Sequence, residues 1–232
     1  MKFEESLIKG RLIKRYKRFL ADIKLSNGKI VTAHCPNPGS MLSLLSKGCE
    51  VWVSKKNNIK SKLPYSWELV RIKKNFIGIN TLLTNKIAIE AIENKRIEEL
   101  SKHKFVKKEV SINISTRIDI LMELRGKPCY IEVKNVTLNR KKLVAEFPDS
   151  ITKRGTKHLQ ELSALAEKGV SAMMLYIVQR SDSKYFKIAS DIDSEYAENL
   201  IQAQKKGVKI LCYNCNVSQY EISVNKKIDF II

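Results

Sequence analysis

The pattern of hydrophobic residues changes near residue 80, and this change constrains the fold of the 232-residue chain more than any other feature. Before it, short strand-like runs are separated by turn residues; they cover 7–13, 19–25, 30–35, 50–54, 67–72 and 76–79. Asn27-Gly28 predicts a hairpin, because a tight two-residue turn favours positive φ at both positions. Residues 41–45 are interpreted as a short helical turn. Five or six short strands in so few residues predict a small closed β-barrel, for which the OB-fold is a candidate.

Helices and strands alternate after residue 80. The expected helices cover 85–100, 156–168 and 194–206, and the expected strands cover 110–123, 130–137, 172–179, 185–189 and 208–213. Gly169 and Gly207 stand where the second and third helices should end. This order predicts a mixed α+β chain with two domains, an OB-like barrel at 1–80 and an α/β domain with a mixed sheet at 81–232.

Composition excludes several classes of protein. Hydrophobic residues make up 44% and charged residues 29%, which is typical of a globular chain. No apolar window is long enough for a membrane span, and the first residues lack the apolar run of a secretory signal. Five scattered cysteines do not suggest a disulfide framework, and the Cys212/Cys215 spacing has no second pair for a zinc site. We therefore expect a cytoplasmic protein with reduced thiols and no membrane partner.

The net charge of +19 suggests a polyanionic partner. Residues 1–80 carry 17 basic and 5 acidic side chains, so the excess is concentrated in the predicted barrel. Lysine and arginine that neutralise phosphates release counterions, which favours binding of nucleic acid. The alternative is a lysine-rich composition with solvated side chains throughout. No spacing typical of a recognition helix or a zinc finger occurs, so base-specific recognition is not predicted.

Two carboxylates and a lysine form the most specific pattern for catalysis. Around Asp119, the alternation of a strand places Ile118 and Ile120 on one face and the aspartate on the other. On the next strand the same rule places Glu132 and Lys134 on a common face. Two carboxylates suit Mg²⁺, and a neighbouring lysine can orient a water molecule or stabilise developing charge. The alternative interpretation is a surface ion pair between Glu132 and Lys134.

An aspartate followed by Glu-x-Lys on the next strand resembles the PD-(D/E)xK nuclease superfamily. That resemblance implies catalytic roles for Asp119, Glu132 and Lys134. It also implies a Mg²⁺ site formed by Asp119 and Glu132. A glutamate of the first predicted helix, Glu90 or alternatively Glu93, would be a further ligand.

Nucleic-acid contacts are predicted where basic and aromatic residues alternate or flank loops. The candidates are Lys14, Arg15, Tyr16, Lys17, Arg18, Lys60, Lys62, Arg154 and Lys157. Phosphate contacts beside an aromatic surface are a common way to hold single strands. Phe19 and Trp67 are interpreted as barrel core rather than stacking surfaces. His158 borders an apolar stripe and is interpreted as structural, the alternative being a contact to a phosphate or a metal-binding carboxylate.

Longer strings show a more specific resemblance. They are RYKRFLAD at 15–22, HCPNPGSM at 34–41, KLPYSWEL at 62–69, IEVKNVTL at 131–138 and FPDSITKRGTKHL at 147–159. Together they resemble the sugar fermentation stimulation protein family. Two positions depart from that family's pattern, Pro38, where it usually has threonine, and Ile118, where an aromatic residue is usual.

The family resemblance implies an OB-like barrel followed by a restriction-endonuclease-like domain in a cytoplasmic prokaryotic protein. It also implies binding of single- or double-stranded DNA without sequence preference, and a regulatory link to sugar, notably maltose, metabolism. The alternative functions are a Mg²⁺-dependent nuclease and an RNA-binding protein.

Overall fold

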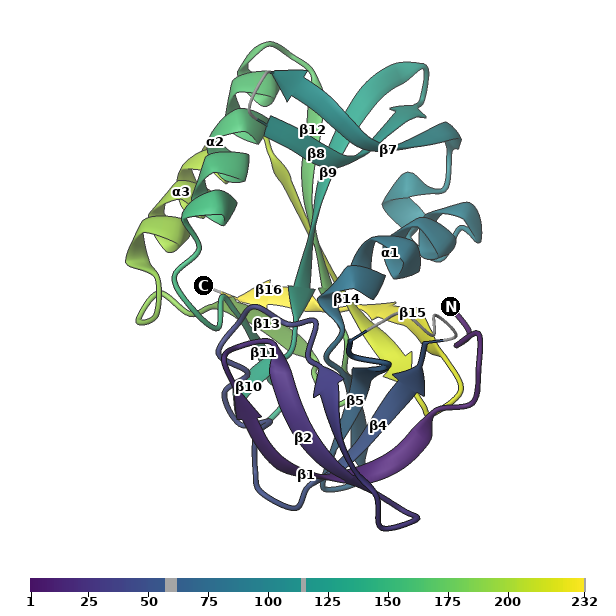
Figure 1. The fold of residues 1–232 in the computed structure, drawn as a ribbon. Coiled ribbons are helices and arrows are strands. Elements are labelled where there is room, and N and C mark those ends of the chain that lie inside the picture. The colour runs from purple at the N-terminus through teal and green to yellow at the C-terminus, as the bar shows by residue number, and fades with distance from the viewer. Residues whose placement is uncertain (57–61, 114–115, 232) are drawn as a thin grey trace.

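The computed structural model describes residues 1–56, 62–113 and 116–231. Figure 1 shows a β-barrel below an α/β domain, with helices on both sides of its central sheet. No helix in the described part of the chain is both long and apolar enough to cross a membrane.

The barrel contains the six strands that the sequence predicts. They are β1 (Ile8–Tyr16), β2 (Leu20–Leu25), β3 (Ile30–His34), β4 (Glu50–Lys55), β5 (Tyr65–Ile72) and β6 (Asn75–Gly78). They pair in the order β3-β2-β1-β4-β5-β6, and an additional pairing of β3 with β5 closes the barrel. Trp67 is fully buried and donates its indole hydrogen to the carbonyl oxygen of Leu69, so its prediction as core is confirmed.

Two turns of the barrel differ from their predictions. The β2–β3 hairpin is present, but only Gly28 of the pair is left-handed, with φ of 85°. The connection is also longer than the predicted two-residue turn, because β2 ends at Leu25 and β3 begins at Ile30. The helical turn at 41–45 is wrong, because Met41 and Ser43 have positive φ values of 54° and 68°.

The second domain is built around a six-stranded mixed sheet with the order β15-β14-β12-β9-β8-β7. Its strands are β7 (His103–Asn113), β8 (Thr116–Leu124), β9 (Lys127–Val136), β12 (Ser171–Val178), β14 (Lys209–Val217) and β15 (Ile222–Lys227). β9, β12 and β14 are parallel, whereas β7, β8 and β15 run antiparallel to their neighbours. The predicted mixed sheet is thus confirmed.

Helices cover both faces of this sheet (Figure 1). The core that contains α1 (Thr84–Glu93) lies on one face, and the core of α2 (Lys153–Glu167) and α3 (Ser194–Lys205) lies on the other. Two short 3₁₀ helices, Thr81–Leu83 and Glu98–Leu100, flank α1. Next to the barrel lies a four-stranded sheet in the order β10-β11-β13-β16, formed by Leu138–Lys141, Val144–Phe147, Tyr185–Ile188 and Asp229–Ile231.

Three expectations for this domain need correction. The helix predicted at 85–100 ends at Glu93, because Lys95 is left-handed and the Arg96 amide closes the helix end on the Ala91 carbonyl. The run 110–123 is not one strand but the facing parts of β7 and β8. Ile118 and Ile120 do not share a face: Ile118 packs with α2 and α3, and Ile120 with α1. The pairing of β8 with β9 stops at Ile120 and Ile131. Beyond this point β8 is no longer held in register with β9, so Ile118 can pack into the other core.

The barrel and the second domain are packed together. Trp52 and Leu69 of the barrel lie in the same hydrophobic core as α1. The amide of Gly78 donates to the carbonyl of Gln179 at 2.9 Å. Asp149, in the loop before α2, accepts a bond from the Met41 amide at 2.9 Å. The barrel is therefore held against the loop that leads into α2.

The absence of a side chain at Gly39 is expected to be essential for the contact between the barrel and Asp149. A Cβ atom at residue 39 would overlap both carboxylate oxygens of Asp149. We expect Gly39→Ala to lower the free energy of unfolding by about 1–3 kcal/mol, the usual effect of overpacking. Chemical denaturation checks the value. Asp149→Ala in the same chain should recover part of the loss, and equal, additive losses from the two substitutions would contradict the proposed overlap.

Candidate metal and nucleic-acid site

Asp119 lies where β8 separates from β9. Because the pairing ends at Ile120 and Ile131, the backbone amide of Val133 is free to bond a side chain. It donates to Asp119 Oδ2 at 2.9 Å, and Asn85 Nδ2 of α1 donates to Oδ1 at 2.8 Å. The carboxylate is therefore fixed on both oxygens at the point where the strands part.

Glu132 and Lys134 share a face of β9, as the sequence predicts. Lys134 Nζ donates to Glu132 Oε1 at 2.6 Å, and His158 Nδ1 of α2 contacts the same oxygen. Lys134 Nζ also lies 3.3 Å from His158 Nδ1. The Glu132 side chain is only 3% exposed, so this ion pair is buried and not the surface pair of the alternative interpretation.

The two carboxylates have different proton affinities. Burial and the neighbouring charge of Glu132 raise the pKa of Asp119. Burial would also raise the pKa of Glu132, but the hydrogen bond from His158 and the positive charge of Lys134 outweigh it and lower the pKa. Two carboxylates that oppose each other's ionisation are stabilised by a cation placed between them.

Glu90, the predicted third acidic residue, is not part of this cluster. It accepts a bond from the N-terminal ammonium of Met1, and its side chain is 37% exposed. Position 90 lies further along α1 than Asn85, the residue whose side chain does reach Asp119. No local pattern marked Asn85 as a site residue, because a polar residue in the first turn of a helix is common. The structure thus pairs Glu90 with the N-terminus and places an amide, that of Asn85, on Asp119.

The residues present fit a divalent cation. Glu132 Oε2 is buried and receives no hydrogen bond from any described residue. Such an oxygen costs free energy unless it gains a ligand or a donor. Two carboxylates are sufficient for Mg²⁺, which commonly keeps several of its waters. No group of three or more His, Cys, Asp or Glu side chains with the geometry of a metal site occurs in the described part of the chain.

A cleft of about 630 Å³ lies between the barrel and the second domain. Arg18, Asn37 and Gly39 line it from the barrel, and Asn135, Asp149 and Arg154 line it from the second domain. Arg154 connects the cleft to the carboxylate cluster, because its Nε lies 3.5 Å from His158 Nε2.

Of the two acidic side chains that line the cleft, Glu146 is paired with a cation and Asp149 is bonded to a neutral amide. Arg140 bonds both oxygens of Glu146 at 2.8 and 2.9 Å. Burial alone would raise the pKa of Glu146, but these bonds lower it. Asp149 is bonded to the Met41 amide. The charge of Arg18 and Arg154 therefore dominates the cleft, which suits an anionic ligand.

An amide network supports the wall of the cleft. Gln179 is fully buried, and its Nε2 donates to Asn135 Oδ1 at 2.6 Å and to Thr84 Oγ1 at 3.2 Å. Asn135, held in this way, lines the cleft. Neither residue was predicted as part of a site, since an isolated asparagine or glutamine carries no positional signal.

The predicted nucleic-acid contacts divide into two groups. Arg15 donates to the carbonyl oxygens of Arg18, Asn37 and Gly39, at 2.9, 2.8 and 2.9 Å, and therefore holds backbone rather than presenting a free charge. Tyr16 donates to Asp22, and Lys14 lies 3.7 Å from the same carboxylate. The exposed group comprises Lys14, Lys17, Arg18, Lys62, Arg154 and Lys157. Lys60 lies outside the described residues.

Two side chains beside apolar runs have different outcomes. Phe19, predicted as barrel core, is 43% exposed, so that prediction is wrong. His158 is buried, as a structural histidine would be, and it contacts the carboxylate of Glu132. The sequence places both residues beside apolar runs, and only the packing shows which of them leaves the core.

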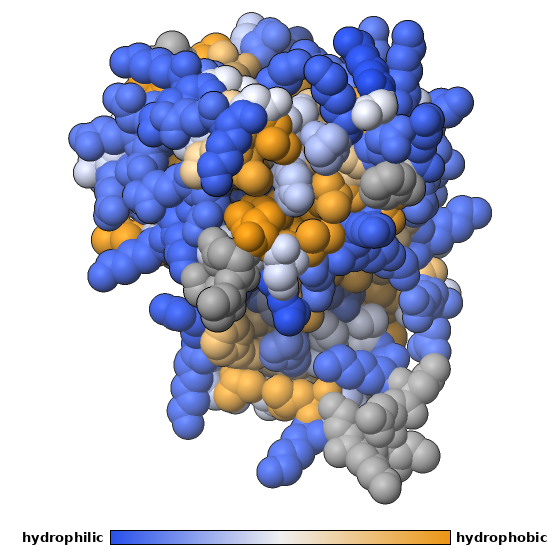
Figure 2. Space-filling model, turned by 90° about the horizontal axis from the view of Figure 1, so that it is seen from above, coloured by the Kyte–Doolittle hydropathy of each residue, from blue (hydrophilic) through white to orange (hydrophobic). Residues whose placement is uncertain are grey.

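Hydrophilic side chains are not confined to the barrel. Figure 2 shows the end of the molecule opposite the barrel, where hydrophilic residues surround a smaller hydrophobic area. The exposed surface of the second domain is thus also solvated by polar residues, and net charge alone does not locate a binding surface.

The fold and the site define a class of protein: a closed barrel joined to a mixed-sheet α/β domain that carries an Asp, Glu-x-Lys and histidine cluster. Family models match both parts. The model of the SfsA N-terminal OB domain matches residues 13–79, and the sugar fermentation stimulation protein RE domain matches residues 82–221. The chain belongs to the sugar fermentation stimulation protein family.

Relatives and a solved structure agree with this assignment. The sugar fermentation stimulation protein homolog of Pelagibacter ubique is 47% identical over 231 residues, which cover 100% of this chain and 99% of the relative. The homolog of Paramagnetospirillum magneticum is 44% identical over 219 residues, which cover 94% of this chain and 92% of the relative. The structure of Pyrococcus furiosus SfsA in complex with Ca²⁺ has a TM-score of 0.91 and 25% identity, covering 100% of this chain and 98% of that chain.

Proposed function

We propose that this protein is a Mg²⁺-dependent phosphodiesterase that binds DNA without base-specific contacts. The observation that carries the proposal is the unpartnered, buried Oε2 of Glu132, next to Asp119 and Lys134. The Ca²⁺ complex of the Pyrococcus furiosus protein supports a site for an oxygen-bound divalent cation in this fold. The proposed role in sugar metabolism rests on the family name.

Asp119 and Glu132 would hold the cation. The cation would polarise a phosphate of the DNA and activate a water molecule. Asn85 and the Val133 amide keep the Asp119 carboxylate oriented. Lys134, placed by Glu132, donates to the negative charge that develops on the attacked phosphate. Arg154, at the cleft side of His158, binds an adjacent phosphate of the strand.

DNA binding without cleavage is the second candidate. It is favoured by the absence of a third acidic ligand in the described part of the chain, which leaves few protein ligands for the cation. In that case the positive charge of the protein would provide affinity, and the carboxylate cluster would have a structural role.

Incubation of supercoiled plasmid and single-stranded circular DNA with the protein separates the two candidates. We expect nicking with Mg²⁺ or Mn²⁺ and none after chelation with EDTA. We also expect binding to weaken steeply as salt rises, because each phosphate contact releases counterions. Salt-dependent binding without nicking under any metal would favour the second candidate, and binding that does not depend on salt would contradict both.

A further inference from the structure

The turn between β1 and β2 displays an aromatic side chain that the core does not use. Phe19 is 43% exposed, and its ring centroid lies 6.4 Å from that of His34 on β3. Burial and the charge of Lys56 lower the pKa of His34, which favours the neutral form of its ring. The two rings are tilted by 31° to each other and together form a small aromatic surface at this end of the barrel.

The backbone holds this turn in one conformation. Lys17 and Arg18 are both left-handed, with φ of 46° and 62°. Such a conformation is unfavourable for residues other than glycine and persists only when surrounding contacts impose it. Arg15 supplies one of these contacts through its bond to the Arg18 carbonyl, while it also holds the loop of Asn37 and Gly39. The exposed ring is therefore preorganised.

The Phe19 ring lies next to positively charged residues and close to the cleft. Both Lys17 and Arg18 precede Phe19 directly and are exposed. Arg18 also lines the cleft that reaches Arg154. At about 630 Å³, this cleft has the size of a small-ligand site and accommodates a short, flexible piece of one strand rather than a rigid duplex.

We propose that Phe19 and His34 form a stacking platform for an unpaired base, and that the preferred ligand is single-stranded DNA or the single-stranded end of a duplex. This inference rests on the proposed function, because it assigns a strand type to the same cleft. A π-face is present on every base, so stacking adds affinity without sequence preference. In duplex DNA the base faces are covered by their neighbours and are not available to Phe19.

Fluorescence anisotropy with a labelled single-stranded oligonucleotide, and with a blunt hairpin of the same sequence, tests the proposal in EDTA. We expect Phe19→Ala to weaken single-strand binding by roughly 5- to 150-fold, the effect of losing one stacked base, and to leave hairpin binding within about twofold. Phe19→Tyr should retain single-strand affinity, because a stacking ring remains.

Ile30→Ala is the matched control, because Ile30 is 62% exposed at the other end of β3. It should not change either affinity. Thermal denaturation of each variant should show an unchanged fold, since both side chains are exposed. Equal losses for the strand and the hairpin, or the same loss with Ile30→Ala, would overturn the platform. If wild-type protein binds and nicks DNA without preferring single strands, only this inference fails; if it binds neither probe, the proposed function fails first.

Discussion

Asp119→Asn is expected to reduce metal-dependent cleavage of DNA by roughly a hundred- to thousand-fold, because it removes charge that stabilises the transition state. The same substitution should change the stability of the metal-free protein little, because it removes an unfavourable buried charge but replaces one of two accepting oxygens by an NH₂ group. Burial and Glu132 raise the pKa of Asp119 above its ordinary value, so ionisation of this carboxyl opposes folding above that pKa. The stability it contributes is present below the unfolded pKa and is lost as pH rises through the folded one. Asparagine does not ionise, so the variant does not lose folding stability in this way at pH 7.

Thermal unfolding with and without Mg²⁺ or Ca²⁺ measures both effects. Wild-type protein should gain thermal stability from the ion, since a ligand that binds only the folded state stabilises it. The Asp119→Asn protein should lose most of this gain. An undiminished metal response would mean that the ion binds elsewhere, and a large loss of stability without metal would assign Asp119 a structural role.

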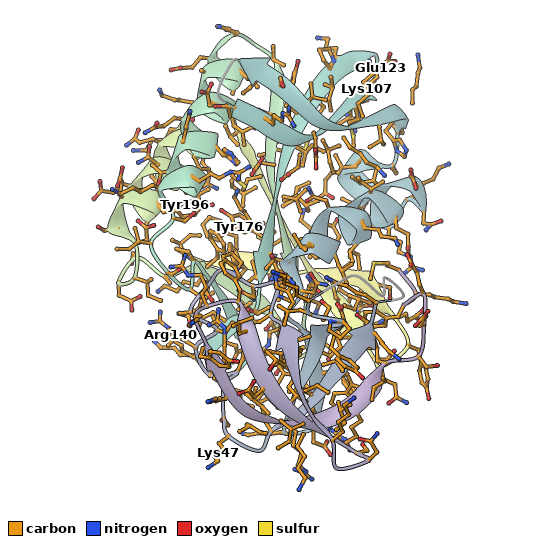
Figure 3. All side chains as sticks on the ribbon, in the orientation of Figure 1. Lys47, Lys107, Glu123, Arg140, Tyr176 and Tyr196 are labelled. Carbon is orange, nitrogen blue, oxygen red and sulfur yellow. The ribbon has the colours of Figure 1, made fainter. Side chains whose placement is uncertain are left out.

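Glu123→Gln provides the control for this experiment, because it makes the same type of change in the same strand. Glu123 lies near the far end of β8, where it pairs with Lys104 at 2.9 Å. Figure 3 shows it near Lys107, away from the helix α2 that carries His158. We expect this variant to keep both cleavage and the metal response.

Lys134→Met should separate catalysis from metal binding. Without the ammonium group, the charge on the attacked phosphate loses its donor, and cleavage should fall by roughly a hundred- to thousand-fold. Glu132 also loses the 2.6 Å bond from Lys134, so the free energy of unfolding of the metal-free protein should fall by about 1–3 kcal/mol. Asp119 and Glu132 are both retained, so the ion should still raise the unfolding temperature.

Lys134→Arg completes this test. The guanidinium keeps the positive charge beside Glu132 but presents it as a planar fork instead of a compact ammonium. We expect it to recover much of the stability and little of the cleavage activity. Unchanged cleavage with Lys134→Met would exclude the lysine from catalysis, even if the metal response agreed with the prediction.

Local patterns in the sequence predicted the elements better than their boundaries. The strands of the barrel and the helices α2 and α3 follow alternation, helical periodicity and terminal glycines, which depend on neighbouring residues only. The left-handed Lys95 that ends α1 early carries no comparable local signal. Strands β10, β11, β15 and β16 were not predicted, and β13, which is as short as β10 and β11, was predicted, so length alone does not explain the omission.

The buried layer beneath α2 and α3 illustrates contacts that no local pattern contains. Tyr176 of β12 and Tyr196 of α3 meet through their hydroxyl groups at 2.5 Å, and Figure 3 shows them between the helices and the barrel. Both rings are fully buried. Each residue lies in a correctly predicted element, but 20 positions separate the two in the chain, and only packing brings them together.

By itself, the sequence determined the order of the two folds, the shared face of Glu132 and Lys134, and the excess of positive charge. These properties follow from composition and from the two-residue period of a strand. The tertiary structure decided which side chains meet. It placed Asn85 rather than Glu90 at Asp119, His158 at Glu132, Arg15 on backbone carbonyls and Phe19 at the surface. The physical reason is that a site is formed by contacts between distant segments, and their directions depend on where strands part and helices pack.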